Sequence, residues 1–207
     1  HDRDMGLPPG AVAPIHLNQS QIQDIQTCQA EERRPFLLTY LGNLRSGPNP
    51  HFHARGGLYE FHNESQGILI MTVTDREQHP TLANRSFADI MSHTVFGAAP
   101  RGDSKYSYRF TEVLAAGTIP VILSDDWVWP FRPELVPWEK CAVILPERMV
   151  KTVPEFLRNM TREERCQRRQ YCYDIYQKYI ATPQGIVDGI IQSLERLAVR
   201  KGQGVDL

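Results

Sequence analysis

Short apolar runs and longer mixed stretches alternate along most of the chain. The apolar runs predict buried strands at 36–41, 67–72, 95–98, 119–123 and 142–145. The stretches between them predict helices at 53–62, 89–92 and 107–116. Because strands that alternate with helices are joined by right-handed crossovers, we expect an α/β fold, a Rossmann-like parallel sheet with helices on both faces. Ligands of such sheets gather beyond the carboxyl ends of the strands.

The last third of the chain is expected to be a helical segment, with helices at 153–157, at 161–180 and after Pro183. Thr161 and Glu164 form a capping-box pattern, and Pro183 suits the first turn of a helix. An arginine run in the second helix is interleaved with glutamates, so we expect a solvated helix face; phosphate binding is the alternative. The run comprises Arg162, Arg165, Arg168 and Arg169.

The proline-rich start of the chain lacks any periodicity, which is typical of a linker. The whole chain has 207 residues, of which 41% are hydrophobic and 23% charged, enough for one sizeable core. We therefore expect a linker segment at 1–34, one domain at 35–200 and a short tail at 201–207.

The charge balance excludes one class of partner. Lys and Arg number 23 and Asp and Glu number 24, so the net charge of -1 offers no extended positive field and we do not expect nucleic acid to bind.

No apolar run approaches the roughly 20 residues of a membrane-spanning helix. Because the chain begins at His1, we expect a fragment of a longer protein, for which the lack of a targeting segment is uninformative.

Asparagine and cysteine usage indicates the cellular compartment. Four of the six asparagines lie in glycosylation sequons, whereas chance would give about one, and this favours a secretory lumen over coincidence. The sequons begin at Asn18, Asn63, Asn84 and Asn159. Two interpretations of the cysteines stay open, one or two disulfides or buried free thiols. The cysteines are Cys28, Cys141, Cys166 and Cys172, without C-x-x-C spacing for zinc.

The stretch from Phe96 to Leu123 carries the clearest chemistry, because it predicts a strand, a polar loop, a helix and a second strand. In the loop, Gly102 would let the backbone approach a ligand, and Arg101 supplies a planar fork of donors. The helix that begins near Ser107 presents unpaired N–H groups, so the unit suits a diphosphate. Ser107 could instead cap the helix.

A helical wheel divides this helix into two faces. Phe110, Val113, Leu114 and Gly117 fall on one face, and Tyr108, Arg109, Glu112 and Ala116 fall on the other. The first face is expected to be buried and the second exposed. Arg109 and Glu112 could form an ordinary helix ion pair, or Glu112 could accept hydrogen bonds from vicinal ribose hydroxyls.

The motifs of this stretch closely resemble the exostosin family of glycosyltransferases. They are Phe96-x-x-x-Pro-Arg-Gly, Ser-Tyr-Arg-Phe-Thr-Glu-Val-Leu from Ser107, Ala-Gly-Thr-Ile-Pro-Val-Ile-Leu-Ser, and Trp-Pro-Phe, closing at Trp138. A weaker likeness extends from Leu37 to about Leu197. Two departures are Gly97 and Thr118, which stand where family members commonly carry cysteines; we expect them to alter stability more than chemistry.

The resemblance implies the C-terminal, donor-binding lobe of a two-lobed glycosyltransferase-B enzyme of the Golgi or endoplasmic reticulum lumen, membrane-anchored in the full-length protein. It also implies a UDP-sugar donor, a glycan acceptor, inversion at the anomeric carbon, an upstream N-terminal lobe, and neither a cofactor nor an obligatory metal. The implied donor-binding residues are Arg45, Arg55, Arg101, Gly102, Ser107, Arg109 and Glu112. For Arg45 and Arg55, surface ion pairing is the alternative to clamping the diphosphate.

Catalysis is less well defined by the residues. Asp125 and Asp126 follow an apolar strand, so either could be the general base that deprotonates the attacking hydroxyl; loop capping is the alternative, and an upstream lobe is a further source of the base. The function expected is sugar transfer from a UDP-sugar to a glycan, and the rival is a non-catalytic lobe that stabilises a partner transferase.

Other candidate sites are weaker. His51 and His53 lack a third metal ligand, so no metal site is expected. Trp127 and Trp129 could stack on a sugar, whereas Trp138 is expected to pack against the sheet.

Overall fold

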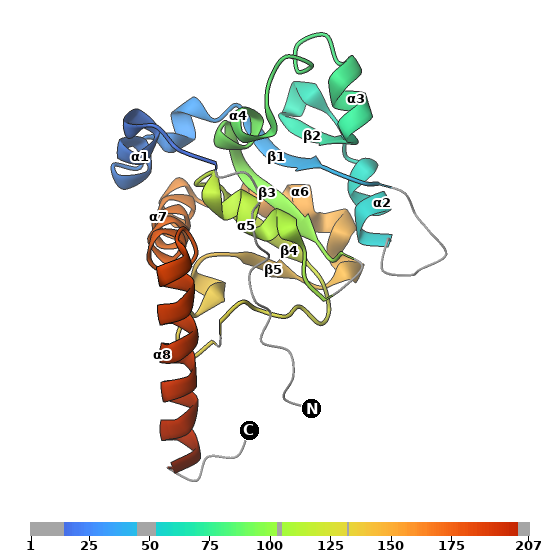
Figure 1. Ribbon diagram of the computed structural model, residues 1–207. Helices are drawn as coiled ribbons and strands as arrows, with labels where there is room; N and C mark the ends of the chain where they lie inside the picture. Colours follow the sequence, from blue (N-terminus) through green and yellow to red (C-terminus); the bar gives the residue numbers. More distant parts are fainter. Residues whose placement is uncertain (1–14, 45–52, 103–104, 132, 203–207) are drawn as a thin grey trace.

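The computed structural model describes residues 15–44, 53–102, 105–131 and 133–202. Its centre is a five-stranded sheet in which every neighbouring pair is parallel, with the strand order β2-β1-β3-β4-β5 (Figure 1). The strands are β1 (Phe36–Leu41), β2 (Ile68–Met71), β3 (Thr94–Pro100), β4 (Ile119–Leu123) and β5 (Val143–Leu145). The expected α/β fold is confirmed.

Helices cover both faces of this sheet, which explains why its strands are continuous apolar runs rather than alternating ones. On one face, Phe96 and Val121 pack with Val153 and Leu157 in a single core cluster. Figure 1 shows α6 behind the sheet and α5 in front of it. The helices of the first face are α2 (His53–Tyr59), η5 (Glu147–Thr152) and α6 (Val153–Asn159); those of the second are α4 (Phe87–Ser92), α5 (Tyr108–Ala115) and α7 (Arg162–Tyr179).

The pattern of apolar runs located the strands well, and β1 and β4 have the predicted bounds. The predicted helix at 53–62 ends earlier, at Tyr59. A short helix that the pattern did not predict, α3 (Val73–Gln78), follows β2. Its capping box joins Thr72 and Asp75, which exchange side-chain and backbone hydrogen bonds. Two 3-10 turns complete the loops, η3 (Glu64–Gln66) and η4 (Trp138–Lys140).

Residues 15–34 are folded onto the domain, although the sequence pattern indicated only a linker there. They contain α1 (Gln19–Gln26) and η1 (Ala30–Arg33). Asn18 begins α1 with a capping box shared with Gln21. The side chain of Ile25 is 1% exposed and packs with Tyr173 of α7. One apolar side of α1 therefore docks on α7.

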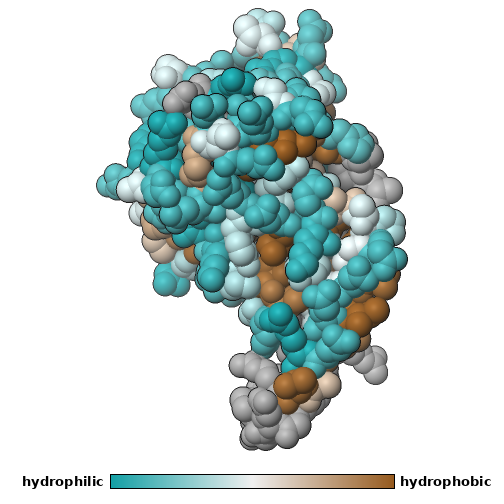
Figure 2. Space-filling view, turned by 90° about the vertical axis from the view of Figure 1, so that its left-hand side faces the viewer, coloured by the Kyte–Doolittle hydropathy of each residue, from teal (hydrophilic) through white to brown (hydrophobic). Residues whose placement is uncertain are grey.

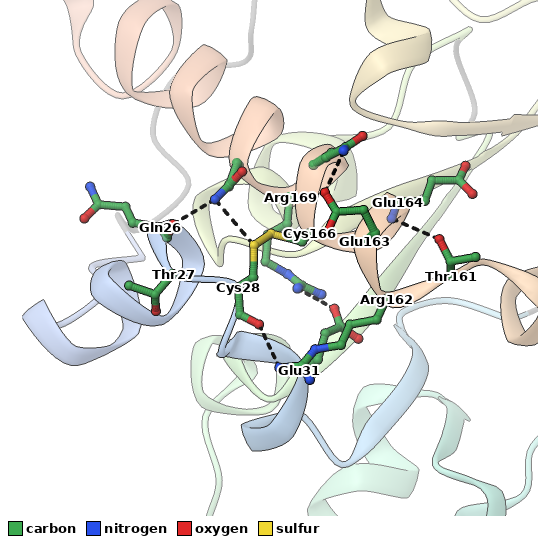
Figure 3. The surroundings of a disulfide bond; sticks show 12 residues. Gln26, Thr27, Cys28, Glu31, Thr161, Arg162, Glu163, Glu164, Cys166 and Arg169 are labelled. Carbon is green, nitrogen blue, oxygen red and sulfur yellow. Dashed lines mark hydrogen bonds and ion pairs between the residues drawn. A yellow bond between two sulfur atoms is a disulfide. The ribbon is translucent and has the colours of Figure 1, made fainter.

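Two disulfides settle the question that the cysteine count left open. Cys28 is bonded to Cys166, which fastens the segment after α1 to α7 (Figure 3). Cys141 is bonded to Cys172, which joins the turn before β5 to the same helix. All four cysteines are paired.

The prediction of a solvated arginine face on α7 is wrong for Arg169, whose side chain is 1% exposed. Its guanidinium forms an ion pair with Glu31 of η1 (Figure 3). Glu31 also lies 3.6 Å from Arg165. Burial lowers the pKa of Arg169, and Glu31 counteracts this effect. The arginine is buried because α1 and η1 cover this side of α7.

The last helix, α8 (Pro183–Gly202), packs on α7 and then runs away from the body of the molecule (Figure 1). Figure 2 views this side, where apolar patches on the lower part interrupt a mostly hydrophilic surface. Exposed apolar side chains of α8 are Val187, Ile191, Leu194 and Val199. Within the described ranges, no helix is long and apolar enough to span a bilayer.

Candidate functional site

The strand order places a topological switch point between β1 and β3. From β1 the chain crosses to β2 on one side, and from β3 it crosses to β4 on the other. The chain therefore crosses from β1 and from β3 in opposite directions, which in open α/β folds opens a crevice at the carboxyl edge of the sheet, the usual ligand position. Leu41 ends β1 at this crevice, and Arg101 follows β3.

A cavity of about 370 Å³ opens at this edge. Its wall is largely apolar, with three charged side chains, Arg76, Arg109 and Glu112. The remaining lining residues are Ile15, Leu41, Val73, Ser86, Phe87 and Ala88. A mainly apolar pocket with a few converging polar groups is typical of a small-molecule site.

Arg109 and Glu112 project from the first turns of α5 into this cavity and form an ion pair. Their side chains are 24% and 14% exposed, respectively, so the pair is shielded from solvent more than a surface pair. The Arg109 guanidinium also lies over the ring of Phe87 in α4, 4.5 Å from its centroid. The ion pair between Arg109 and Glu112, which was the simpler alternative, is therefore present. The Glu112 carboxylate nevertheless lines the cavity.

The two faces of α5 agree with the helical wheel at most positions. Phe110, Val113 and Leu114 are fully buried, and Tyr108 is 63% exposed. Ala116 is the exception, because it was predicted on the exposed face and is fully buried. Ala116 is the C-cap residue of α5, where the chain turns toward β4. It is buried because it packs against Met91.

Ser107 is the N-cap residue of α5, but its hydroxyl accepts no hydrogen bond from the helix amides. Ser86 and Thr161 do form such bonds, with the amides of Asp89 and Glu164. The capping role considered for Ser107 is therefore not realised, and the amides of the first turn of α5 lack a side-chain cap.

The Arg101-Gly102 loop is held by β4 and by the loop that follows it. The Arg101 amide donates to the carbonyl of Leu123 over 3.1 Å, and its guanidinium lies 2.7 Å from Asp126. A Cβ atom on Gly102 would lie 2.7 Å from the carbonyl oxygen of Tyr106, so the loop itself requires glycine. The buried Nε of Arg101 has no hydrogen-bond partner among the described residues.

Arg55 of α2 reaches the same loop, because its Nε donates to the carbonyl of Arg101 over 3.1 Å. Burial raises the pKa of Tyr40, near the end of β1, while the positive charges of Arg55 and Arg109 act in the opposite direction. Both guanidiniums thus favour the ionised form of the Tyr40 hydroxyl electrostatically. Arg45, the other candidate clamp, lies outside the described residues.

Both candidate bases lie in the loop after β4, as expected, but neither lines the cavity. Asp126 lies within ion-pairing distance of Arg101 and Lys105, at 2.7 and 3.5 Å. Asp125 accepts a hydrogen bond from the amide of Glu147 over 3.2 Å, which is the loop-capping arrangement.

Of the tryptophans after β4, Trp138 belongs to the core, and Trp127 and Trp129 are partly buried against it. Trp127 packs against Tyr106 and Phe110, with centroid distances of 5.4 and 5.9 Å. Trp129 stacks on Trp138 with a centroid distance of 5.4 Å, and Trp138 is 1% exposed. The expected packing of Trp138 is confirmed, whereas Trp127 and Trp129 contact protein rings rather than the cavity.

Within the part of the chain that the structure describes, no three His, Cys, Asp or Glu side chains lie together in a group that could hold a metal ion. His51 and the side chain of His53 fall outside that part.

Two departures from the family pattern, Gly97 and Thr118, have local explanations. A Cβ atom on Gly97 would lie 2.5 Å from the Val113 side chain, so this packing excludes a larger residue. Thr118 donates a buried hydrogen bond to the carbonyl of Met91 over 2.7 Å, and it also accepts one from Arg34.

Of the residues that line the cavity, sequence reasoning proposed only Arg109 and Glu112; the missed ones include Val73, Arg76 and Phe87. Val73 and Arg76 lie in α3, which the pattern did not predict, and Phe87 begins a six-residue helix too short for a clear periodicity. Only the fold brings them next to Glu112.

Known proteins match most of this chain. The family described as Exostosin GT47 domain matches residues 6–160, a range that contains every candidate site residue. An Exostosin-1 homolog from Caenorhabditis elegans is 30% identical over 106 residues, or 51% of this chain and 28% of that protein. Exostosin-1 from Drosophila melanogaster is 28% identical over 145 residues, or 64% and 19%. Exostosin-1b from Danio rerio is 27% identical over 165 residues, or 70% and 22%. The matched region thus spans between a fifth and a little over a quarter of these relatives.

Proposed function

The chain belongs to the exostosin GT47 family, and on that basis we propose that it binds the donor for a glycosyltransferase reaction. The donor is a UDP-sugar whose hexose or hexuronic acid is transferred, with inversion and without an obligatory metal, to a hydroxyl group of a glycan. The chain supplies the donor-binding lobe, and an upstream lobe supplies most of the acceptor pocket.

The observation that carries this proposal is the placement of Phe87, Arg109 and Glu112 in one cavity at the switch point. A nucleoside has a flat apolar base and two vicinal hydroxyls. The Arg109 guanidinium covers one face of the Phe87 ring, and the rest of the ring offers a surface for the base. The carboxylate of Glu112 can accept hydrogen bonds from the hydroxyls. The apolar wall formed by Leu41 and Val73 excludes water from the base.

The diphosphate is proposed to lie beside the first turn of α5, where the Ser107 hydroxyl and the uncapped helix amides are available as donors. Arg101 and Arg55 are joined through the Arg101 carbonyl and supply positive charge at the same edge. Arg45 stays a predicted member of this clamp.

The general base is proposed to come from the upstream lobe. The oxygens of Asp126 face Arg101 and Lys105, and an oxygen of Asp125 is occupied by a backbone amide. A base must have a free oxygen within hydrogen-bond reach of the hydroxyl that it deprotonates. Asp126 is a candidate only if substrate binding displaces its partners, whereas Asp125 has a second oxygen but does not line the cavity.

A rival proposal is a non-catalytic lobe that stabilises a partner transferase. It is favoured by the same engagement of Asp125 and Asp126, because among the described residues the only carboxylate that lines the cavity is then Glu112, which is assigned to the ribose. Donor binding without transfer by the complete protein would support the rival.

The compartment is proposed to be the Golgi or endoplasmic reticulum lumen, with a membrane anchor in the full-length protein. Two disulfides support an oxidising compartment, and the asparagines of all four sequons are exposed.

Calorimetric titration tests donor binding directly. We expect the purified chain to bind UDP more tightly than UMP or inorganic pyrophosphate, because the pocket receives both the base and the diphosphate. Absence of heat with millimolar UDP would contradict donor binding by this chain alone. Transfer is then assayed with the full-length protein, a panel of UDP-sugars and oligosaccharide acceptors.

A further inference from the structure

Four sequons lie on the surface, but their hydroxyl groups have different partners. In the sequon Asn63-Glu64-Ser65, the Ser65 hydroxyl donates to the side-chain oxygen of Asn63 over 2.7 Å. The three residues and their flanking neighbours, 62–66, are all exposed. With its oxygen bound to Ser65, the Asn63 amide carries its nitrogen on an exposed loop.

The hydroxyls of the other sequons are directed elsewhere. Ser20 accepts a hydrogen bond from Arg33, and Ser86 and Thr161 cap α4 and α7. The oxygen of Asn18 is also occupied, because it accepts from the amide of Gln21. Within the described residues, only the sequon at Asn63 joins its hydroxyl to its own asparagine.

The loop around Asn63 is closed by contacts that are local in sequence. The backbones of Asn63 and Ile68 exchange two hydrogen bonds of 2.9 Å, and Gly67 turns the chain with a φ of 71°. Loops closed over so few residues form quickly, so this geometry is available to the chain before its tertiary structure is complete.

The position of Asn63 also leaves the candidate site open. Asn63 lies just before β2, at the amino edge of the sheet, whereas the cavity lies at the carboxyl edge. A bulky glycan at Asn63 would extend away from the crevice. Asn84 contrasts with it, because it lies two residues before Ser86, which lines the cavity.

We propose that Asn63 is an N-glycosylation site. The Nδ2 of Asn63 attacks the anomeric carbon of an oligosaccharide carried on a lipid pyrophosphate. A bond forms between Nδ2 and that carbon, the bond from the carbon to the pyrophosphate oxygen breaks, and the lipid pyrophosphate leaves with the electron pair. The proton lost from Nδ2 passes to a base of the oligosaccharyltransferase. The donor is a lipid-linked oligosaccharide, so this modification is independent of the UDP-sugar chemistry proposed above.

The test uses the 207-residue chain secreted from a eukaryotic cell. Peptide-N-glycosidase digestion in heavy-oxygen water converts each glycosylated asparagine to a labelled aspartate, and peptide mass spectrometry then reads the four sequons separately. We expect the Asn63 peptide to be labelled in most molecules. A secreted, disulfide-bonded chain whose Asn63 peptide is mainly unlabelled would overturn the proposal, whatever the state of the other three.

Variants provide an independent readout by gel mobility. Ser65→Ala retains the asparagine but removes the sequon, and it should lose one glycan, as should Asn63→Gln. Ser65→Thr is the matched control and should keep the glycan. An unchanged mobility of Ser65→Ala would also overturn the proposal. Because mass spectrometry maps the glycosylated asparagines of the parent chain directly, the test does not depend on whether a variant is secreted well.

Discussion

The Arg109 guanidinium lies over the ring of Phe87, 4.5 Å from the ring centroid, and thereby joins α5 to α4 across the cavity. The same guanidinium pairs with Glu112, so the carboxylate and the ring belong to one contact network. A cation over an aromatic ring contributes about 0.5 to 2 kcal/mol, depending on solvent exposure. Changes at either residue should therefore alter how the cavity binds a ligand.

Replacing Phe87 by leucine should weaken UDP binding by about five- to tenfold, because stacking of a base on an aromatic ring contributes roughly 1 to 3 kcal/mol. Phe87→Tyr retains the ring and should bind UDP almost as the parent chain does. Calorimetry measures both. If Phe87→Leu bound UDP with unchanged affinity, the base would not contact this ring.

Glu112→Gln should weaken UDP binding by roughly ten- to a hundredfold and leave inorganic pyrophosphate unaffected, since hydrogen bonds to charged groups contribute roughly 1.5 to 3 kcal/mol. Glu155→Gln, at an exposed position of α6, is the matched control and should change neither affinity. Equal losses for UDP and pyrophosphate would show that Glu112 does not bind the ribose.

Ser107→Ala should leave the unfolding free energy nearly unchanged, because the Ser107 hydroxyl does not cap α5. It should weaken pyrophosphate binding, because it removes a proposed donor to the diphosphate. Ser86→Ala removes a cap that does form, so it should cost about 1 kcal/mol of unfolding free energy. Urea unfolding compares the two variants. A comparable loss of stability in Ser107→Ala would indicate that the serine has a structural role.

Removing the disulfide between Cys141 and Cys172 as a double alanine variant should lower the unfolding free energy by about 3 to 4 kcal/mol, from the loop entropy of a 31-residue separation. The pair of Cys28 and Cys166 spans 138 residues, and its removal should cost about 5 kcal/mol. Urea unfolding with and without reductant measures both. Midpoints equal to that of the parent would mean that the disulfides do not form.

Alkaline pH should destabilise the fold through Tyr106, because burial raises the pKa of this tyrosine from 10.0 to about 12. A raised pKa means that the folded state favours the neutral phenol. The contribution of Tyr106 to the stability of the fold is complete below pH 10 and is lost as the pH rises through about 12. Absorbance titration of phenolate formation should show one late-titrating group fewer in Tyr106→Phe. An unchanged titration curve would contradict the shift.

Much of the fold could be predicted because its signals are local. Parallel strands buried on both faces are short apolar runs, so β1 and β4 had the predicted bounds. The 3.6-residue period divided α5 correctly except at Ala116, where the helix ends and the period no longer applies.

The candidate site was predicted only in part. Arg109 and Glu112 could be assigned to one face because they lie three residues apart on one helix. Phe87 comes from a different helix, and no pattern within either segment relates them. Ring contacts of Trp127 and Trp129 could not be predicted either, because the packing of an aromatic side chain depends on which other rings surround it.

From the sequence alone come the α/β class, the order of most elements, the sequons and the motif that links the chain to its family. Each is determined by residues that lie near one another along the chain, through periodicity, capping or motif spacing. Tertiary structure alone decided the pairing of Cys28 with Cys166, the burial of Arg169 against Glu31 and the joining of Phe87 to Arg109. These contacts join segments that are distant in sequence, and whether they form depends on how helices pack on a shared sheet.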